Sequence, residues 1–393
     1  MNPGTHPFDT ITPQSLTERG SWKWTRFPGT LPGFVAEMDF PLAEPITRAL
    51  ADSFSNERFG YLPQPVAEEL KEATAEYVGR THGWSVESDR VYISGDVLQA
   101  YEVALRELIT PGSPIIVPTP AYMPFLTLTK ALGHPVVEVP MVEGQNGRPE
   151  MDLSTIAEHL GGSAELVVLC NPHNPLGLVY TQEELQGLAE VVEGADGMVF
   201  SDEIHAPLVF DGHRHIPYAT VNESAAQHSI TAISASKAWN LPGLKCSQLV
   251  VTSDRHQELL APLSFIVSHA ASTPGVVASI AAYREGGPWL DDVRAYLSGN
   301  FDVLDDFAAN HLPGSGYRRP EGTYITWFDA RSIDIGTSDS PADYLREHAG
   351  VSLTDGALCG EAGKGHLRLI AATSRPILVE LLERIAAHWE RHN

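Results

Sequence analysis

Four stretches of the chain place a polar side chain directly after a short apolar run, and the last of them ends in a lysine. The polar residues are Tyr122, Asn174, Asp202 with His205, and Ser234 with Lys237. Such runs are typical of parallel strands buried on both faces, and ligands of open α/β sheets bind beyond the carboxyl ends of the strands. The sequence therefore predicts one site built from several strand ends. An amine, a carboxylate, an amide, an imidazole and a phenol gathered there suit a charged heterocyclic cofactor.

Lys237 is the candidate nucleophile of this site. Small residues surround it in SASKAW, which leaves room for a Schiff base. Burial lowers the pKa of an amine and makes it nucleophilic at neutral pH. A lone SxxK also occurs by chance, or around the serine of a penicillin-binding protein, but that class needs SDN and KTG motifs, which this sequence lacks. On its own, Lys237 is as compatible with chance as with catalysis.

Asp202 and His205 in SDEIH extend the pattern. A carboxylate held against a pyridine nitrogen keeps that nitrogen protonated, so that the ring can absorb carbanion charge. Asp202 precedes Lys237 by about one strand–helix–strand step, although a helix cap would also explain the aspartate. His205 could hydrogen-bond a ring oxygen of the cofactor, or could be a structural histidine.

Asn174 lies in NPHNPLG, where turn-forming residues and prolines predict a tight strand-to-loop turn. Its amide could donate to the same ring oxygen. Tyr122 offers a ring to stack on the cofactor, although an aromatic at a sheet edge also serves packing.

A phosphate site is predicted where strand-like VYIS meets Gly95, Asp96 and Val97 at the start of an apolar-periodic helix. Free backbone N–H groups and the dipole at a helix start bind phosphate. The carboxylate of Asp96 would repel a phosphate, so we expect it to cap the helix with its side chain turned away. Ser234 could add a hydroxyl from the other side.

The composition excludes several classes of protein. A net charge of −24 argues against nucleic acid as a partner. The sequence has no apolar stretch long enough for a membrane helix and no signal peptide at its start. Its three cysteines are widely separated, which predicts neither a disulfide framework nor a zinc cluster and makes the cytoplasm the default location. The histidines, including His213 and His215, show no metal-ligand spacing, so no metal site is predicted.

At 393 residues, about two domains are expected. Residues 46–285 alternate strand-like and helix-like segments, which predicts a large α/β domain with a helix capped by Thr181 and Glu184. Residues 286–393 predict a smaller α+β domain: a helix over 291–312, strands in TYITWFDA and GHLRLIAA, and a final helix from Arg375. Residues 1–45 read as irregular sequence that could join this smaller domain.

Several longer motifs add a resemblance: SWKW, FVAEMDFPLAEPI, FGYLPQP, NPHNPLG, SDEIH, SASKAWNLPGLK, EGTYITWFD and GHLRL. In order and over nearly the whole chain, they resemble fold-type-I enzymes that depend on pyridoxal 5′-phosphate (PLP), in the aminotransferase class I/II superfamily. More narrowly the chain is similar to the MalY/PatB-type cystathionine β-lyases. The resemblance implies an α/β fold with a large PLP-binding domain, whose sheet is mixed but mostly parallel, and a smaller α+β domain.

The resemblance also implies roles for individual residues. Lys237 matches the lysine that binds the cofactor covalently, Asp202 the partner of the pyridine nitrogen, and Asn174 and His205 the contacts of the ring oxygen. Tyr122 matches the stacking aromatic, and the phosphate contacts fall on Gly95, Asp96, Val97 and Ser234. Tyr61 matches a tyrosine that reaches the phosphate of the neighbouring subunit, which implies a homodimer with shared sites. Arg368 matches the arginine that holds the substrate carboxylate, with Glu37 also in the substrate pocket.

Departures from the family pattern concern the substrate pocket. Glu37 stands where an aspartate is usual, Cys359 where an aromatic is frequent, and Asp96 where a neutral residue is common. Ile370 and Ser374 replace an asparagine and a proline. The implied activity is β-elimination from cystathionine or another S-substituted L-cysteine, giving a thiol, pyruvate and ammonia. An aminotransferase uses the same residues and stays an alternative, as does, more remotely, a non-catalytic regulatory protein of this fold.

Overall fold

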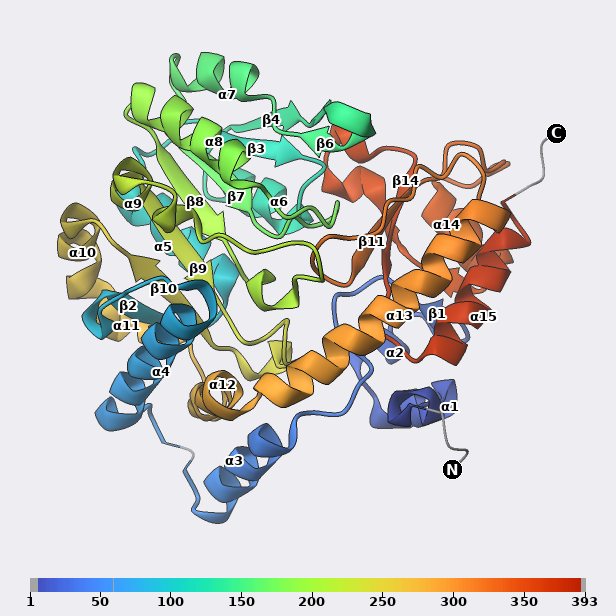
Figure 1. Cartoon of the computed structure of the whole chain (residues 1–393), viewed down its shortest axis with the longest axis horizontal. Coiled ribbons are helices and arrows are strands. Elements are labelled where there is room, and N and C mark those ends of the chain that lie inside the picture. Colours follow the sequence, from blue (N-terminus) through green and yellow to red (C-terminus); the bar gives the residue numbers. More distant parts are fainter. Residues whose placement is uncertain (1–5, 59, 390–393) are drawn as a thin grey trace.

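The computed structural model describes residues 6–58 and 60–389 and contains one large sheet of seven strands (Figure 1). In spatial order the strands are β2 (Val91–Ser94), β10 (Ser247–Val251), β9 (Ser229–Ile233), β8 (Met198–Asp202), β7 (Leu166–Cys170), β3 (Ile115–Thr119) and β4 (Val136–Pro140). β10 is antiparallel to both of its neighbours, β2 and β9, and all other adjacent pairs in this sheet are parallel. The predicted α/β class with a mixed, mostly parallel sheet is confirmed.

The four apolar runs form the strands β3, β7, β8 and β9 because both faces of the sheet are covered. Along β7, Leu166 and Val168 pack into one core with α5 and α6, while Val167 and Leu169 pack into a second core with α7 and α8. A strand buried on both sides has no place for polar side chains until it ends. Polar residues therefore gather at the strand ends.

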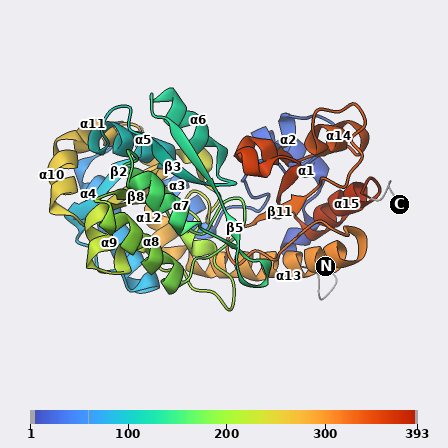
Figure 2. The same cartoon turned by 90° about the horizontal axis from the view of Figure 1, so that it is seen from above.

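Helices surround this sheet on both faces (Figures 1 and 2). They are α4 (Gln64–His82), α5 (Val97–Leu108), α6 (Met123–Ala131), α7 (Leu153–Leu160), α8 (Gln182–Gly194), α9 (Glu223–His228), α10 (Asp254–Leu260), α11 (Ser264–Ser268) and α12 (Thr273–Glu285). A further helix, α3 (Glu44–Ser55), packs against α12. The capping box predicted for α8 is present, since Thr181 and Glu184 each accept the other's backbone N–H.

A smaller part of the molecule lies beside the large sheet, and the long helix α13 (Gly287–His311) runs along both (Figure 2). This smaller part contains an antiparallel sheet with the strand order β11 (Ile325–Asp329), β14 (His366–Ile370) and β13 (Thr354–Asp355). The helices α14 (Pro341–His348) and α15 (Arg375–Ala386) cover this sheet. The helices and strands predicted after residue 286 are therefore confirmed. The domain boundaries themselves stay a prediction, and residues 1–5 and 390–393 of the predicted small domain lie outside the described residues.

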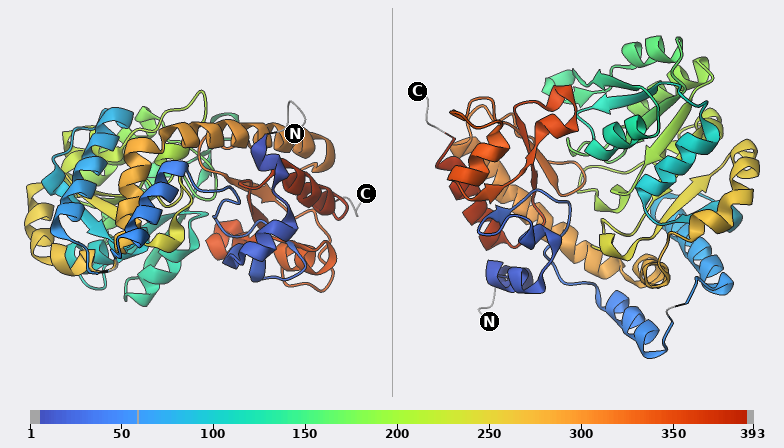
Figure 3. Two further views of the ribbon diagram at one scale, coloured as in Figure 1. Left: turned by 90° about the horizontal axis from the view of Figure 1, so that it is seen from below. Right: turned by 180° about the vertical axis from the view of Figure 1, so that it is seen from behind.

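The N-terminal segment joins the smaller part, as Figure 3 shows from two sides. Its strand β1 (Leu31–Pro32) pairs with β12 (Val351–Ser352), and its apolar side chains share a core with those of α15. We expected irregular sequence here, which was wrong in part, because the segment contains α1 (Pro13–Arg19) and α2 (Trp22–Thr25). Thr12 and Ser15 cap α1 reciprocally, a short signal among prolines and aromatics.

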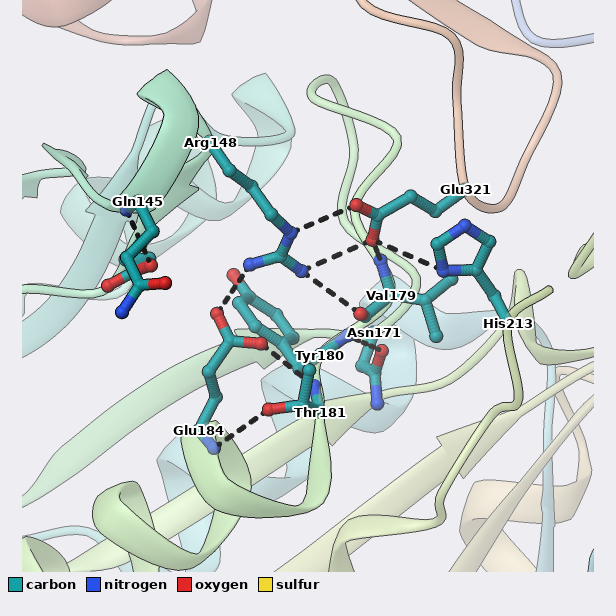
Figure 4. A network of polar contacts seen from close by, with 10 residues as sticks. Gln145, Arg148, Asn171, Val179, Tyr180, Thr181, Glu184, His213 and Glu321 are labelled. Carbon is teal, nitrogen blue, oxygen red and sulfur yellow. Dashed lines mark hydrogen bonds and ion pairs between the residues drawn. The ribbon is translucent and has the colours of Figure 1, made fainter.

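A polar network ties three distant segments together (Figure 4). Arg148, beside the hairpin of β5 (Val142–Glu143) and β6 (Pro149–Glu150), donates to Glu184 of α8 at 2.7 Å and to Glu321 at 2.9 Å. Glu321 also accepts the backbone N–H of Val179 at 2.8 Å. The carboxylate of Glu321 therefore holds the segment before β11 against the loop after β7.

For the residues that the structure describes, no single helix is both long and apolar enough to cross a membrane. One bent pair, Asp254–Ser268 with Thr273–Glu285, meets the criteria of length and composition when taken together.

Candidate active site

A cavity of about 170 Å³ lies where β7, β8 and β9 end. Eight of the residues predicted from the sequence line it: Gly95, Asp96, Val97, Tyr122, Asn174, Asp202, His205 and Lys237. The predicted convergence of strand ends therefore occurs in the fold. The remaining four, Ser234, Arg368, Glu37 and Tyr61, are not among its lining residues.

Lys237 follows β9 and reaches the cavity through a tight turn. Its Nζ donates to the carbonyl oxygen of Ala36 at 3.0 Å, and among residues 6–58 and 60–389 no carboxylate lies within ion-pair distance of it. Burial and the charge of Arg368 lower the pKa of Lys237 to about 8, against the opposing influence of Glu37 and Asp202. An amine with such a pKa is partly neutral near physiological pH and available as a base or nucleophile.

Asp202 is the last residue of β8 and is buried. Its Oδ1 accepts the backbone N–H of Ile204 at 3.2 Å, and its Oδ2 accepts the thiol of Cys170 at 3.9 Å. Burial raises the pKa of Asp202 to about 7, although the Ile204 hydrogen bond and Lys237 oppose that shift. A buried carboxylate with no cationic hydrogen-bond partner in the described residues would be stabilised in its ionised form by a cationic ligand in the cavity.

His205 is buried behind the same wall of the cavity. Its Nδ1 lies 3.0 Å from the hydroxyl of Thr323, which can donate to or accept from that nitrogen. Burial lowers the pKa of His205 to about 3, and the charges of Lys237 and Arg368 act in the same direction. A neutral imidazole can offer one donor or acceptor to a ligand in the cavity.

Arg368 lies in β14 and is 4 % exposed. Its guanidinium donates to Asn174 Oδ1 at 3.2 Å, to the carbonyl oxygen of Phe34 at 3.0 Å and to Thr354 Oγ1 at 3.2 Å. Its Nε has no partner among the described residues, and no carboxylate there pairs with it. A buried guanidinium satisfied only by neutral oxygens favours an anionic ligand, and its planar fork matches a carboxylate.

The segment 34–38 joins these groups. The carbonyl oxygen of Ala36 accepts both Lys237 Nζ and, at 3.1 Å, the hydroxyl of Tyr324. The side chain of Asn240 donates to the carbonyl oxygen of Met38 and accepts its N–H. Glu37 in this segment is partly buried and outside the cavity lining, and it acts on Lys237 through its charge.

The residues predicted to hold a phosphate, Gly95, Asp96 and Val97, lie at the start of α5. Asp96 caps this helix as expected, with Oδ1 accepting the N–H of Gln99 at 2.9 Å. Its Oδ2 accepts Lys245 Nζ at 2.7 Å, and these hydrogen bonds outweigh burial and lower the pKa of Asp96. At Gly95 a Cβ would come within 2.7 Å of the carbonyl oxygen of Ala270, so only glycine fits.

Ser234 is placed differently from the expectation. Its hydroxyl donates to the carbonyl oxygen of Cys246 at 2.7 Å and accepts the N–H of Ser236, and it is Ser236 that lines the cavity. The two serines are two residues apart in a turn, where strand alternation no longer tells which side chain faces the ligand. A phosphate contact of Ser234 stays a prediction, and Ser236 becomes a second candidate.

Tyr61 lies away from the cavity of its own chain and is 88 % exposed. Its ring centroid lies 5.6 Å from that of His269, next to the exposed side chains of Phe265 and Ile266. Tyr122 lies at the start of α6 with its ring edge-on to Phe125, at 5.6 Å between centroids, and burial raises its pKa to about 12.

Sequence reasoning missed four neighbours of the site. They are Lys245 and Ser236 in the cavity wall, Thr354 beside Arg368, and Tyr324 above Ala36. Lys245 closes the SASKAWNLPGLK motif and could have been noticed as a second cation near the predicted phosphate site. The approach of Thr354 and Tyr324 depends on long-range folding that no local pattern reveals.

The residues present fit PLP as a ligand. Asp202 is a buried carboxylate that a cationic ring nitrogen would stabilise, Lys237 is an amine of lowered pKa, and the start of α5 with Lys245 lies at the cavity, where a phosphate would find a helix N-terminus and a cation. In the described part of the chain, no three His, Cys, Asp or Glu side chains are grouped as metal ligands.

This sheet topology, with a lysine, a carboxylate and a candidate phosphate site at its strand ends, is typical of fold-type-I PLP-dependent enzymes. Residues 35–385 match the family model of the class I and II aminotransferases, and the chain belongs to this family. A cystathionine β-lyase of Corynebacterium glutamicum is 36% identical over 377 residues, which cover 95% of this chain and 98% of the relative.

Two solved structures agree with this placement. A Corynebacterium diphtheriae protein provisionally assigned as a PLP-dependent β-cystathionase is 36% identical, with a TM-score of 0.90 over 98% of this chain and 99% of the other. Cystalysin of Treponema denticola, which contains PLP, is 26% identical, with a TM-score of 0.89 over 98% and 99% of the two chains. The resemblance to PLP enzymes of the aminotransferase class I/II superfamily, and within them to cystathionine β-lyases, is confirmed.

Proposed function

We propose that the protein is a PLP-dependent carbon–sulfur lyase that cleaves cystathionine or another S-substituted L-cysteine to a thiol, pyruvate and ammonia. The observation that carries the proposal is the presence of two cations, the partly buried Lys237 and the buried Arg368, that have no carboxylate partner among the described residues. Lys237 offers an amine of lowered pKa in the cavity, and Arg368 offers a guanidinium fork linked to the cavity through Asn174. The relatives named as cystathionine β-lyases support the choice of reaction.

In this proposal PLP is held by the residues of the cavity. Asp202 pairs with its pyridine nitrogen, Asn174 and His205 contact its ring oxygen, and Tyr122 stacks on its face. The start of α5 with Gly95, Asp96 and Val97, together with the serines before Lys237, holds the phosphate. When bound, PLP supplies a pyridinium ring that withdraws electrons from the substrate and stabilises negative charge at its Cα.

The protein residues then divide the remaining work. Arg368 binds the α-carboxylate and orients the amino acid, and Glu37 sits at the edge of the pocket. Lys237 Nζ accepts the proton from Cα, and the electron pair left there expels the sulfur from Cβ as a thiolate. Proton transfer by a positioned base contributes about 10²- to 10⁴-fold. The three-carbon fragment left behind takes up water and ends as pyruvate and ammonia.

The reaction is tested by incubating the holoenzyme with cystathionine in the absence of any keto acid. The lyase predicts equal amounts of pyruvate and free thiol. An aminotransferase with the same residues would instead require a keto acid and transfer the amino group to it. S-alkyl cysteines, offered in the same assay, show whether the pocket also accepts cysteine S-conjugates.

Arg368→Lys is expected to raise the KM for cystathionine by about 10- to 100-fold, because each lost charge-assisted hydrogen bond costs about 1.5–3 kcal/mol. Lysine keeps the charge but not the planar fork that reaches Phe34 and Asn174. Steady-state kinetics check the result, with the exposed Arg331→Lys as matched control. An unchanged KM would remove Arg368 from substrate binding.

We further propose a homodimer whose sites are shared through Tyr61. Its 88 % exposure, beside the exposed Phe265 and Ile266, supports a surface that a second copy covers. Co-expression of Tyr61→Ala with the inactive Lys237→Ala should recover about a quarter of wild-type activity, since half of the dimers then contain one intact site. Co-purification through two different tags verifies that mixed dimers form. If mixed dimers form and activity does not recover, Tyr61 does not contribute to the site of the neighbouring subunit.

We propose the cytoplasm as the location. Cys170, Cys246 and Cys359 are all buried and unpaired, which suits a reducing compartment.

A further inference from the structure

A second cavity, of about 550 Å³, lies outside the candidate active site and shares no lining residue with it. Its walls are the end of α4, the loop 206–215, Trp239 and the junction of α12 with α13. Figure 1 shows α4, α12 and the start of α13 next to one another. Its size is that of a site for a small organic ligand.

The charge of this cavity is opposite to that of the whole protein. Within the described residues, four arginines and three histidines line it against two aspartates, in a chain of net charge −24. Arg284 is paired with Glu69 and Glu76, and Arg294 with Asp291. Two guanidinium groups, those of Arg80 and Arg214, have no carboxylate within ion-pair distance among the described residues.

Arg80 and Arg214 approach the cavity from different elements. Arg80 donates to the carbonyl oxygen of Tyr283 at 2.7 Å, with its guanidinium carbon 5.9 Å from the centroid of Tyr77. Arg214 lies in the loop after β8, close enough to act electrostatically on His82 of α4. Two guanidinium groups without carboxylate partners on one cavity favour an anionic ligand such as a carboxylate or a phosphate.

A buried side chain inside the cavity also lacks a partner. His215 is 3 % exposed, and its Nε2 is hydrogen-bonded to Glu203 at 2.8 Å. Its Nδ1 is buried without a partner in the described residues. Its ring packs edge-on against that of His82 at 5.0 Å between centroids. The wall of the cavity therefore contains a buried ring nitrogen that no described protein group satisfies, close in the chain to Arg214.

The floor of the cavity is aromatic. Tyr77 and Tyr283 are stacked at 4.8 Å between centroids, and Trp239 packs edge-on against both at 5.9 and 5.8 Å. Trp239 is fixed by the hydrogen bond from its Nε1 to the carbonyl oxygen of Gly286 at 2.9 Å. Tyr77 is 8 % exposed, Tyr283 3 % and Trp239 1 %, so these rings form a rigid base, and Tyr77 is the one that offers most contact to the apolar part of a ligand.

We propose that this cavity is a second ligand site, for a small organic anion. Its carboxylate or phosphate pairs with Arg80 and Arg214, and its apolar body packs against Tyr77. The walls of the site are connected to the candidate catalytic segments: Trp239 is two positions after Lys237, and Glu203, which is hydrogen-bonded to His215, follows Asp202 directly. The loop that carries His213 and Arg214 is also held near Glu321, as Figure 4 shows for His213.

Isothermal titration of the PLP-loaded enzyme with phenyl phosphate and with benzoate tests the proposal, and their relative affinities tell whether phosphate or carboxylate is preferred. Saturable binding of at least one is expected, and inorganic phosphate should bind at least about tenfold more weakly than phenyl phosphate if that is the preferred probe. The double variant Arg80→Ala/Arg214→Ala, at two exposed positions, should weaken binding by about tenfold or more. Arg331→Ala, an exposed arginine elsewhere, should leave it unchanged.

Binding at the substrate site must be separated from binding here. The Arg368→Lys enzyme should keep the affinity for the probe if the cavity beside Trp239 binds it. Loss of binding in Arg368→Lys, full affinity in the double variant, or no saturable binding of either probe below about 10 mM would each overturn the proposal. These outcomes are independent of the lyase assay, because the titration needs no turnover.

Discussion

Lys237→Ala is expected to lower the release of pyruvate and thiol from cystathionine by at least about ten-thousand-fold. The loss of a positioned general base alone accounts for about 10²- to 10⁴-fold. Lys237 is also the group that would bond the cofactor, so both effects fall on one side chain. The replacement removes the amine that donates to the carbonyl oxygen of Ala36, and Tyr324 still donates to that oxygen. The fold should therefore survive.

Activity is measured together with the visible absorbance of the purified protein, because the band of the lysine-bound cofactor should disappear in the variant. Lys364→Ala is the matched control: this exposed lysine pairs only with Glu361 and should leave both readouts unchanged. Retention of turnover by Lys237→Ala, in protein of native thermal stability, would remove the lysine from the mechanism and with it the proposed function.

The large sheet could be predicted from local sequence because its strands are buried on both faces. β7 and β9 consist of apolar or small residues from end to end, so their boundaries coincide with the first polar residues. Asn174, Asp202 and Lys237 could be found for the same reason: each is a polar group at the end of a buried strand or a few residues beyond it. The topology then brings these positions into one cavity without further information.

The parts that escaped prediction depend on contacts between distant residues. Arg368 could be singled out by its motif, but its hydrogen bonds to Phe34 and Thr354 require the N-terminal segment to fold over β14. The choice between Ser234 and Ser236 depends on the turn geometry before Lys237. In such places the sequence shows which residue is present but does not show where its side chain points.

The second cavity shows the same limit. His213 and His215 lack any metal-ligand spacing, and the sequence gives them no role. The fold places His215 beside His82, with Arg214 near both, although α4 and the loop after β8 are far apart in the chain. A positively charged site in an acidic protein can therefore be formed by arginines and histidines from distant segments that share no sequence motif.

Asp202→Asn is expected to have opposite effects on the cofactor-free protein and on the active enzyme. Burial raises the pKa of the carboxyl group from 3.8 to about 7. The folded protein therefore binds this proton more tightly than the unfolded chain, and the stability contributed by Asp202 is present below about pH 4 and lost as the pH rises through 7. Each pKa unit corresponds to about 1.4 kcal/mol, so the ionised carboxylate costs the cofactor-free protein a few kcal/mol at pH 8.

Asparagine has the same shape and no charge. Cofactor-free Asp202→Asn should therefore unfold at a higher denaturant concentration than the parent at pH 8, and the difference should vanish near pH 4. The loaded variant should lose turnover by about a thousandfold or more, since no carboxylate then keeps the pyridine nitrogen protonated. Urea titrations of both proteins at the two pH values and the pyruvate assay provide the measurements, with the exposed Asp292→Asn as control.

The two results must occur together for the assignment to hold. A carboxylate retained only for structure would not destabilise the cofactor-free protein at pH 8, and its replacement would leave turnover intact. The role of Asp202 as counterion of the cofactor would be contradicted if the Asp202→Asn variant were less stable than the parent at pH 8, or if it were as active as the parent. A gain in stability accompanied by a loss of turnover would mean that the buried charge of Asp202 destabilises the cofactor-free protein. A cationic ligand in the cavity would then offset this destabilisation.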